Sequence, residues 1–369
     1  MSVLVTGATG FLGGHLCALL LRSEQVCCVV RGRTDQGAEA RLRAHLTRLG
    51  GPFEPERLTV VRGDLSRPRM GLPAAVYTRL AERVETVYHC AATVNLAASC
   101  EHLVPGNVTA TREVVRFARH RRTKALHHVS SVAVFAAARE LGCAEVDEAT
   151  EPILAMSGGL GYGQSKFHGE EQVRLAAAEG LPVTVYRPGA ILGHSRDWQF
   201  SDTDLWTRLV RAAVEVGAAP DSPATMPGAP VDHTAAMIVE LSRSSSAAGR
   251  VFHPNYLEPI RVGDVFDRVR AAGCDLPAVD PADWKQALLR HAHLPASGLV
   301  LACWAGIAYM VVPEPRYLPP CSRARLTTSV APLPEPALDE AYFARMLAGI
   351  AERGHIPKIN QLSNPSSPP

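Results

Sequence analysis

The sequence predicts an α/β protein built on a doubly wound parallel sheet, with a smaller, mostly helical C-terminal lobe. In the first half of the chain, short apolar segments rich in β-branched residues alternate with longer helical segments. This alternation is typical of parallel strands that are buried on both faces and joined by helical crossovers. It ends after about residue 194, and from about residue 261 the pattern is mostly helical with many prolines.

The expected strands are short, and each is bounded by glycine, proline or polar residues. They lie at residues 3–5, 26–30, 58–62, 86–90, 126–130 and 183–186, with a returning strand at 251–252. A helix is expected at about 11–22, directly after the first strand. We therefore assign residues 1–193 to the sheet domain, with returning elements at about 228–255. Residues 194–227 and 256–357 form the second lobe, and the polar segment 358–369 is a mobile tail.

Composition excludes several classes of protein. The chain has 369 residues, 47% hydrophobic and 20% charged, as in an ordinary globular protein. A formal net charge of +2 is too small for a nucleic-acid-binding protein. The nine cysteines show neither a CxxC pair nor a zinc-ligand spacing, so we expect reduced, buried thiols in a cytoplasmic protein and no metal site. The apolar stretch 299–312 is shorter than the roughly 20 residues that span a bilayer, which favours a buried helix over a membrane span.

A glycine-rich turn follows the first expected strand. The residues GATGFLG occupy positions 7–13 and open the first helix. Gly7 permits a tight turn, Gly10 lets the backbone approach a diphosphate, and Gly13 lets helix and strand pack closely. The N-terminus of the helix supplies N–H donors and the positive end of a dipole to the phosphates. With a strand before it and an apolar helix after it, this motif predicts a dinucleotide site of the Rossmann type.

The end of the second expected strand distinguishes NAD from NADP. An NAD-binding protein places a carboxylate there, against the ribose hydroxyls. This chain has Arg31 and Arg33, no acid before Asp35, and Arg41 in the helical stretch that follows. Because a guanidinium keeps its charge and pairs well with phosphate, the sequence predicts NADP(H), with Arg31 and Arg41 at the 2′-phosphate. A solvated surface charge is the alternative for Arg33 and Arg41.

Two further strand ends complete the expected cofactor site. Asp64 and Leu65 follow the third strand, at the sheet edge where an adenine would lie. Asp64 either accepts from the adenine amino group or caps the next helix. Cys90, Ala91 and Ala92 end the fourth strand, and their small side chains leave room for the backbone of the cofactor.

The segment Tyr162-Gly-Gln-Ser-Lys166 begins a helical stretch that runs towards residue 180. Residues four apart share one helix face, so the Tyr162 hydroxyl and the Lys166 ammonium are expected in the same site. A neighbouring ammonium favours the phenolate, so we expect a lowered Tyr162 pKa and proton transfer to a carbonyl oxygen that receives a hydride. Ser131, at the end of the fifth strand, is expected to hydrogen-bond that carbonyl. Asn107, expected at the start of a helix, either organises a water near Lys166 or acts as a cap.

The order of these motifs resembles the extended short-chain dehydrogenase/reductases. The motifs are TGATGFLG at 6–13, VR at 30–31, GDL at 63–65, HCAA at 89–92, SS at 130–131, YxxxK at 162–166 and YRPG at 186–189. More narrowly, the chain is similar to the thioester reductase domains that end nonribosomal peptide and polyketide synthetases and carboxylic acid reductases. That closer likeness covers about residues 1–357 and rests on VN at 94–95, NVTAT at 107–111, RPGAILG at 187–193, PVDH at 230–233, FHP at 252–254, DW at 283–284 and HIP at 355–357.

The resemblance implies NADPH-dependent reduction of an acyl or peptidyl thioester, held on the phosphopantetheine arm of a carrier protein, to an aldehyde or further to an alcohol. It implies that Ser131, Tyr162 and Lys166 are catalytic and that the lobe binds the substrate, with a pocket wall at about 136–159 and 194–230. The cofactor contacts expected from the motifs and the resemblance together are Gly7, Thr9, Gly10, Phe11, Leu12, Gly13, Arg31, Arg41, Asp64, Leu65, Cys90, Ala91, Ala92, Asn107, Tyr162, Lys166, Pro188, Gly189 and Ile191.

Two departures from the family pattern and two rival functions remain open. His233 stands where the family has an aromatic residue, and the first strand begins directly after Met1, as in a free-standing reductase acting in trans or an excised domain. A nucleotide-sugar epimerase or a hydroxysteroid-type dehydrogenase shares the superfamily motifs, but Arg31 argues against an NAD enzyme. A non-enzymatic NADP sensor is disfavoured because Ser131, Tyr162 and Lys166 are all present. The acyl substrate and the oligomeric state do not follow from the sequence.

Overall fold

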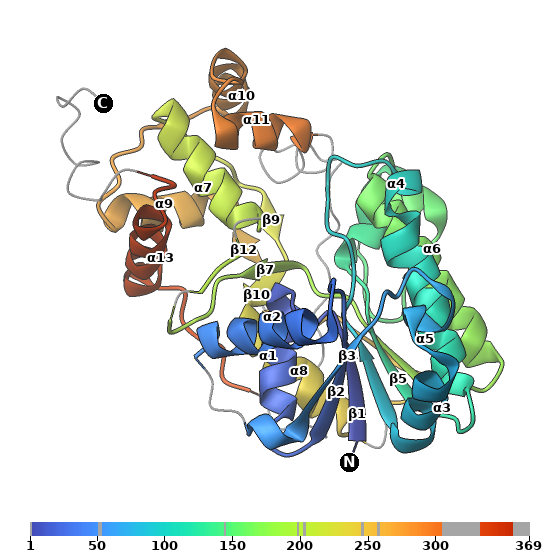
Figure 1. The fold of residues 1–369 in the computed structure, drawn as a ribbon. Coiled ribbons are helices and arrows are strands. Elements are labelled where there is room, and N and C mark those ends of the chain that lie inside the picture. The colour runs from blue at the N-terminus through green and yellow to red at the C-terminus, as the bar shows by residue number, and fades with distance from the viewer. Residues whose placement is uncertain are drawn as a thin grey trace.

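The computed structural model describes residues 2–50, 54–143, 145–197, 199–201, 204–244, 247–256, 259–304 and 333–356. Over these residues the chain forms a sheet domain and a helical lobe above the carboxyl ends of the strands (Figure 1). Within the same ranges, none of the helices has the length and apolar character needed to span a membrane.

A seven-stranded parallel sheet lies at the centre of the described chain, in the order β11-β6-β5-β4-β1-β2-β3. From β1 the chain adds β2 and β3 on one side, returns to the other side with β4, and continues outward. The order therefore reverses between β1 and β4, which is where ligands bind in doubly wound sheets. The strands are β1 (Ser2–Thr6), β2 (Gln25–Val30), β3 (Leu58–Arg62), β4 (Thr86–His89), β5 (Ala125–Val129), β6 (Val183–Tyr186) and β11 (Val251–Phe252).

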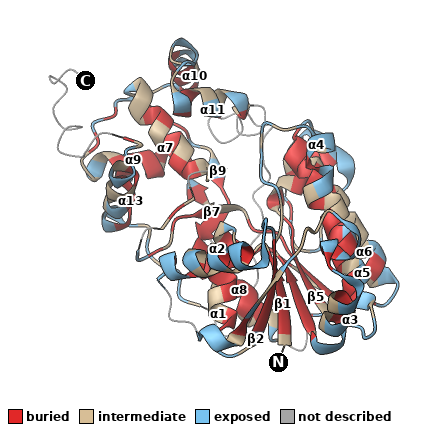
Figure 2. Ribbon diagram, viewed as in Figure 1, coloured by how far each residue is buried: buried red, intermediate tan, exposed pale blue. Residues whose placement is uncertain are grey.

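The inner strands β1, β4, β5 and β6 are buried on both faces, as the continuous apolar segments predict (Figure 2). At the edge of the sheet, β3 leaves Thr59 and Arg62 exposed. In β1, Val3 and Val5 join the core under α1 and α8, whereas Leu4 joins the core under α3, α5 and α6. This alternation follows from the two-residue period of a strand. The helices around the sheet are α1 (Phe11–Leu20), α2 (Asp35–Arg48), α3 (Ala74–Arg83), α4 (Cys100–Val104), α5 (Ala110–Arg119), α6 (Gly161–Ala178) and α8 (Val231–Ser242).

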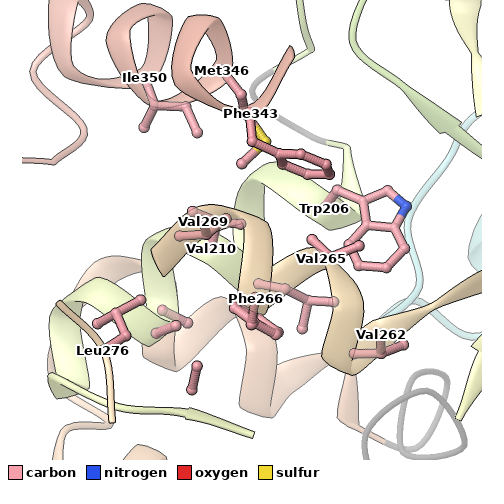
Figure 3. Close-up of a cluster of buried hydrophobic side chains, with 14 of the residues drawn as sticks. Trp206, Val210, Val262, Val265, Phe266, Val269, Leu276, Phe343, Met346 and Ile350 are labelled. Carbon is pink, nitrogen blue, oxygen red and sulfur yellow. The ribbon is translucent and has the colours of Figure 1, made fainter. Parts of the chain in front are cut away.

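The lobe has a hydrophobic core of its own, separate from those of the sheet. Figure 3 shows this core, in which Trp206 and Val210 meet Val265, Phe266 and side chains of the last helix. Its helices are α7 (Leu205–Val216), α9 (Val262–Ala271), α10 (Pro281–Arg290), α11 (Pro295–Ala302) and α13 (Glu340–Glu352). Its short strands pair as β7 (Ala190–Leu192) with β10 (Gly228–Pro230), β8 (Ala219–Pro220) with β13 (Ala278–Val279), and β9 (Thr225–Met226) with β12 (Ile260–Arg261).

The seven strands of the sheet lie where the sequence predicts them, but one helix does not begin at the residue that was expected. Asn107 lies inside a continuous helical run from Cys100 to Arg119, in a wider π-helical turn at Pro105–Thr109. The prediction that it begins a helix is therefore wrong. The wider turn begins at Pro105, which has no N–H to donate to a regular α-helical hydrogen bond. Of the apolar stretch 299–312, only the part to residue 304 lies among the described residues, and the tail 358–369 lies outside them.

Candidate active site

A cavity of about 670 Å³ opens at the carboxyl ends of β1, β4 and β5 and reaches the helical lobe. Its wall comes from the glycine loop, the residues that follow β4, β5 and β6, the first turns of α6, and α7. The lining residues used below are Gly7, Thr9, Gly10, Phe11, Leu12, Gly13, His45, Arg48, Cys90, Ala92, Ser131, Tyr162, Lys166, Pro188, Gly189, Ile191, Phe200, Asp204, Arg208, Met226 and Arg353. The cavity therefore brings together most of the predicted cofactor residues and the whole predicted catalytic set.

The glycine loop has the geometry that a dinucleotide needs. Gly7 adopts φ of +75°, and a Cβ atom there would lie 2.7 Å from the Ala91 nitrogen. A Cβ at Gly13 would lie 2.3 Å from the Gly7 carbonyl oxygen, so only glycine lets α1 pack so close to the loop. Gly10 is the N-cap of α1 and has no side chain to cap the first N–H groups. These donors therefore fit the diphosphate of a dinucleotide.

Helix α2 brings two residues to the glycine loop that were absent from the sequence prediction. The Nε2–H of His45 donates to the carbonyl oxygen of Gly10 over 3.1 Å, and a side chain at Gly14 would collide with this imidazole. Burial is the main reason that the pKa of His45 is lowered, so the ring is neutral. Arg48, in the same last turn, also lines the cavity. The sequence pattern that could have predicted these two residues is the spacing of Arg41, His45 and Arg48, which places them on one face of the helix.

Neither of the predicted arginines, Arg31 and Arg41, lines the cavity. Arg31 is exposed where β2 ends, and its charge contributes to the lowered pKa of Asp64. Arg41 is exposed on α2 and is not part of the cavity wall. The Asp64 carboxylate accepts from the N–H and the hydroxyl of Ser66, at 3.0 and 2.7 Å, and so stabilises its own turn.

Ser131, Tyr162 and Lys166 line the same cavity, as predicted. Ser131 follows β5, and Tyr162 and Lys166 lie one helical turn apart in α6. The Lys166 ammonium donates to the Val129 carbonyl oxygen over 2.8 Å. This contact fastens α6 to the end of β5, two residues before Ser131.

The pKa of Tyr162 departs from the sequence expectation. Burial raises it to about 12, and the Ser131 hydroxyl acts in the opposite direction. The prediction that Lys166 lowers this pKa is wrong for the protein without its cofactor, because the ammonium is directed at Val129 rather than at the phenol. The phenol is therefore a protonated hydrogen-bond donor at neutral pH. Burial lowers the pKa of Lys166 to about 8, while the carboxylate of Glu170 favours its charged form.

A buried ion pair connects α6, which carries Tyr162 and Lys166, to the end of β6. Glu170, one turn after Lys166, accepts from the Arg187 guanidinium at 2.5 and 3.2 Å, and the two side chains are only 0% and 2% exposed. Arg187 also donates to the Thr150 carbonyl oxygen over 3.1 Å and stacks on the Phe135 ring. From the sequence, Arg187 was assigned only as part of a family motif. The geometry shows that it joins α6 to the end of β6, where Pro188 and Gly189 line the cavity.

Asn107 is buried and is not a wall residue of the cavity. Its Nδ2 donates to the Ser165 hydroxyl over 2.8 Å, and that hydroxyl donates to the Tyr162 carbonyl oxygen over 2.8 Å. Its Oδ1 accepts from the Thr93 N–H at 2.7 Å. Asn107 therefore joins the segment after β4 to the turn of α6 that carries Tyr162.

The lobe closes the far side of the cavity. Phe200, Asp204 and Arg208 come from the start of α7 and the segment before it, and Met226 comes from β9. These four residues lie in the stretch 194–230, where a pocket wall was expected from the sequence. Arg353, just beyond α13, packs its guanidinium 4.0 Å from the centre of the Phe200 ring. No sequence pattern predicted that Arg353 lines the cavity.

Comparison with known proteins assigns the family. The family described as "Male sterility protein" matches residues 5–238, and the chain belongs to it. A solved terminal R domain from the myxalamid PKS-NRPS biosynthetic pathway superposes with a TM-score of 0.87, at 31% identity, over 96% of this chain and 92% of that one. The chain is therefore a reductase of the short-chain dehydrogenase/reductase type that binds a nicotinamide cofactor.

Two curated relatives are much longer than this chain. Isonitrile lipopeptide synthase of Streptomyces coeruleorubidus is 36% identical over 294 residues, which are 78% of this chain and 20% of that protein. One subunit of the linear gramicidin synthase of Brevibacillus parabrevis is 32% identical over 291 residues, which are 78% of this chain and 6% of that protein. The chain thus matches one segment of each multidomain enzyme.

Proposed function

We propose that this protein reduces a thioester, carried on the phosphopantetheine arm of an acyl or peptidyl carrier protein in the cytoplasm, to an aldehyde or further to an alcohol with NADP(H). The observation that carries the proposal is the placement of Ser131, Tyr162 and Lys166 in one cavity that runs from the glycine loop to the helical lobe. The likeness of nearly the whole chain to a terminal R domain supports a substrate attached to a synthetase.

The chain's residues act on the carbonyl oxygen of the thioester. When bound in this cavity, a reduced nicotinamide would supply the hydride that the carbonyl carbon accepts. Tyr162, protonated because burial raises its pKa, donates its proton to the oxygen, and Ser131 donates a second hydrogen bond. The Lys166 ammonium, which donates to Val129 while the phenol is protonated, is attracted to the negative charge that forms one helical turn away and stabilises the phenolate that remains. The phenolate then takes back the hydroxyl proton of the hemithioacetal as the carbon–sulfur bond breaks, which releases the thiolate and the aldehyde.

The choice of NADP(H) rests on the end of β2. Arg31 stands there, where an NAD-binding site has a carboxylate. The first acid, Asp35, is already engaged, because the Arg62 Nε–H donates to it over 2.6 Å. A 2′-phosphate at this position would meet a guanidinium instead of an unpaired carboxylate.

The test is NADPH oxidation, followed by the absorbance of the reduced nicotinamide, with an acyl-pantetheine thioester and with the corresponding ketone that has a methylene group in place of the sulfur. Products are identified by mass spectrometry. Consumption with the thioester and release of thiol together with aldehyde or alcohol supports the proposal, and the product shows how many hydrides are transferred. Turnover of free ketones, alcohols or nucleotide sugars, with no NADPH consumption on any thioester, would leave the fold assignment unchanged and would refute the thioester as the substrate.

A further inference from the structure

Two guanidinium groups in the cavity wall have no acceptor oxygen among the residues that the structure describes. Within those ranges, neither Arg48 nor Arg208 forms an ion pair or donates a hydrogen bond to oxygen. Arg208 directs Nη1 at the Cys303 sulfur, at 3.9 Å, and its Nε is buried without a partner there. Arg48 is exposed, so water can solvate its guanidinium, whereas Arg208 is half-buried. Burying a charged donor without an acceptor is unfavourable, so the guanidinium of Arg208 favours an anionic ligand.

The remaining basic and acidic side chains of the wall are engaged, among them Arg353, whose Nη1 donates to the Phe200 carbonyl oxygen over 3.5 Å. The Lys166 ammonium donates to Val129, and His45 donates to Gly10. Asp204 attracts Arg208, but its oxygens accept from the N–H and the hydroxyl of Thr207, so it caps α7. The Asp204 carboxylate therefore leaves the donors of Arg208 available to another group.

The two arginines belong to different parts of the fold. Arg48 is in the last turn of α2, against the glycine loop, where the cofactor diphosphate accounts for a cation. Arg208 is in α7, which is fixed in the core of the helical lobe by Trp206, Leu209 and Val210 (Figure 3). No residue of the glycine loop belongs to that core. A cation for the cofactor diphosphate is therefore supplied by Arg48, and the position of Arg208 in the lobe calls for a different anionic ligand.

We propose that Arg208 binds an anionic oxygen group of the thioester substrate. Phosphate and carboxylate are the groups whose geometry matches a guanidinium fork. In a thioester substrate they have two sources, the phosphate of the pantetheine arm and a carboxylate on the acyl chain. The proposal rests on the proposed thioester reduction and adds a charge requirement to the substrate.

The test compares wild type with Arg208→Met and Arg208→Lys on four substrates. The first pair is an alkanoyl thioester of phosphopantetheine and the same thioester of pantetheine. The second pair is the pantetheine thioester of a dicarboxylic half-acid and its methyl ester. Arg211→Met is the matched control, because Arg211 lies on the same helix, outside the cavity wall.

Losing a charged hydrogen-bond partner is expected to raise KM about 10- to 100-fold for the anionic member of one pair only. Arg208→Lys keeps the charge and is expected to recover part of the loss, and Arg211→Met is expected to behave as wild type. Selectivity within the first pair identifies the phosphate, and selectivity within the second identifies the carboxylate. Equal effects on all four substrates, no effect on any, or a loss of NADPH affinity instead would overturn the proposal.

A binding measurement keeps this result separate from the reductase activity. Isothermal titration gives the dissociation constants of unacylated phosphopantetheine and pantetheine, and of the half-acid thioester and its methyl ester without a reduced cofactor. If wild type prefers the anionic ligand and Arg208→Met does not, the anion site stands even when no thioester is reduced. If binding shows no preference in either pair while thioesters turn over, the anion site is refuted and the reductase function stands.

Discussion

Lys166 is the residue at which stability and catalysis are expected to conflict. Burial lowers its pKa in the folded protein from 10.5 to about 8. Below about pH 8 the folded protein must hold a buried ammonium, which destabilises it. As the pH rises from the folded pKa towards the unfolded pKa, the unfolded chain binds the extra proton, and the stability of the wild type increases. Lys166→Met removes this titration and keeps an unbranched side chain that is one atom shorter.

The shift from 10.5 to about 8 corresponds to about 3 kcal/mol of unfolding free energy. Between roughly pH 7 and pH 10 the wild type should therefore gain about 2–3 kcal/mol relative to Lys166→Met. Urea unfolding followed by circular dichroism at both pH values measures this difference, and titrating groups that do not interact with Lys166 cancel in the comparison. The same variant should lose turnover. A stability difference that does not change with pH would show that Lys166 is not desolvated and would refute the reasoning.

Three further substitutions test other parts of the structure. Gly13→Ala places a Cβ against the loop carbonyl and should weaken NADPH binding at least about tenfold in a fluorescence titration, whereas Gly159→Ala, in open space, should not. Arg187→Met leaves the Glu170 carboxylate buried without its cation and should cost about 3–5 kcal/mol in urea unfolding. Arg31→Ala should weaken NADPH binding about tenfold or more and leave NADH binding nearly unchanged.

Each of these has an outcome that contradicts it. Normal cofactor affinity in Gly13→Ala would mean that the loop can move away from α1. A loss below about 1 kcal/mol in Arg187→Met would place the Glu170 carboxylate in contact with water. Equal losses for NADPH and NADH in Arg31→Ala would remove the argument for a 2′-phosphate at the end of β2.

The sheet and the central site were accessible from the sequence because their signals are local. Continuous apolar segments predict strands buried on both faces, and all seven strands lie where they were expected. A glycine loop between a strand and a helix, and a tyrosine one turn before a lysine, depend only on neighbouring residues. Ser131 was found because a strand end in a parallel sheet always faces the ligand edge.

The remaining features depend on long-range packing. His45 and Arg48 reach the glycine loop only because of the way α2 folds back over it. Arg208 and Arg353 are far apart in the chain and meet the cavity only when the lobe is assembled. Four strands of the lobe have two residues each, too few to show a period. The Tyr162 pKa was misjudged because helix spacing places Lys166 nearby without showing that its ammonium is directed at Val129.

The most direct test of the central claim is single-turnover reduction of an acyl-pantetheine thioester by wild type and by Tyr162→Phe. If Tyr162 protonates the carbonyl oxygen, the variant should reduce the thioester at least about 100-fold more slowly and bind NADPH as tightly as wild type. A rate close to that of the wild type would contradict the assignment of Tyr162 as the acid and, with it, the proposed mechanism.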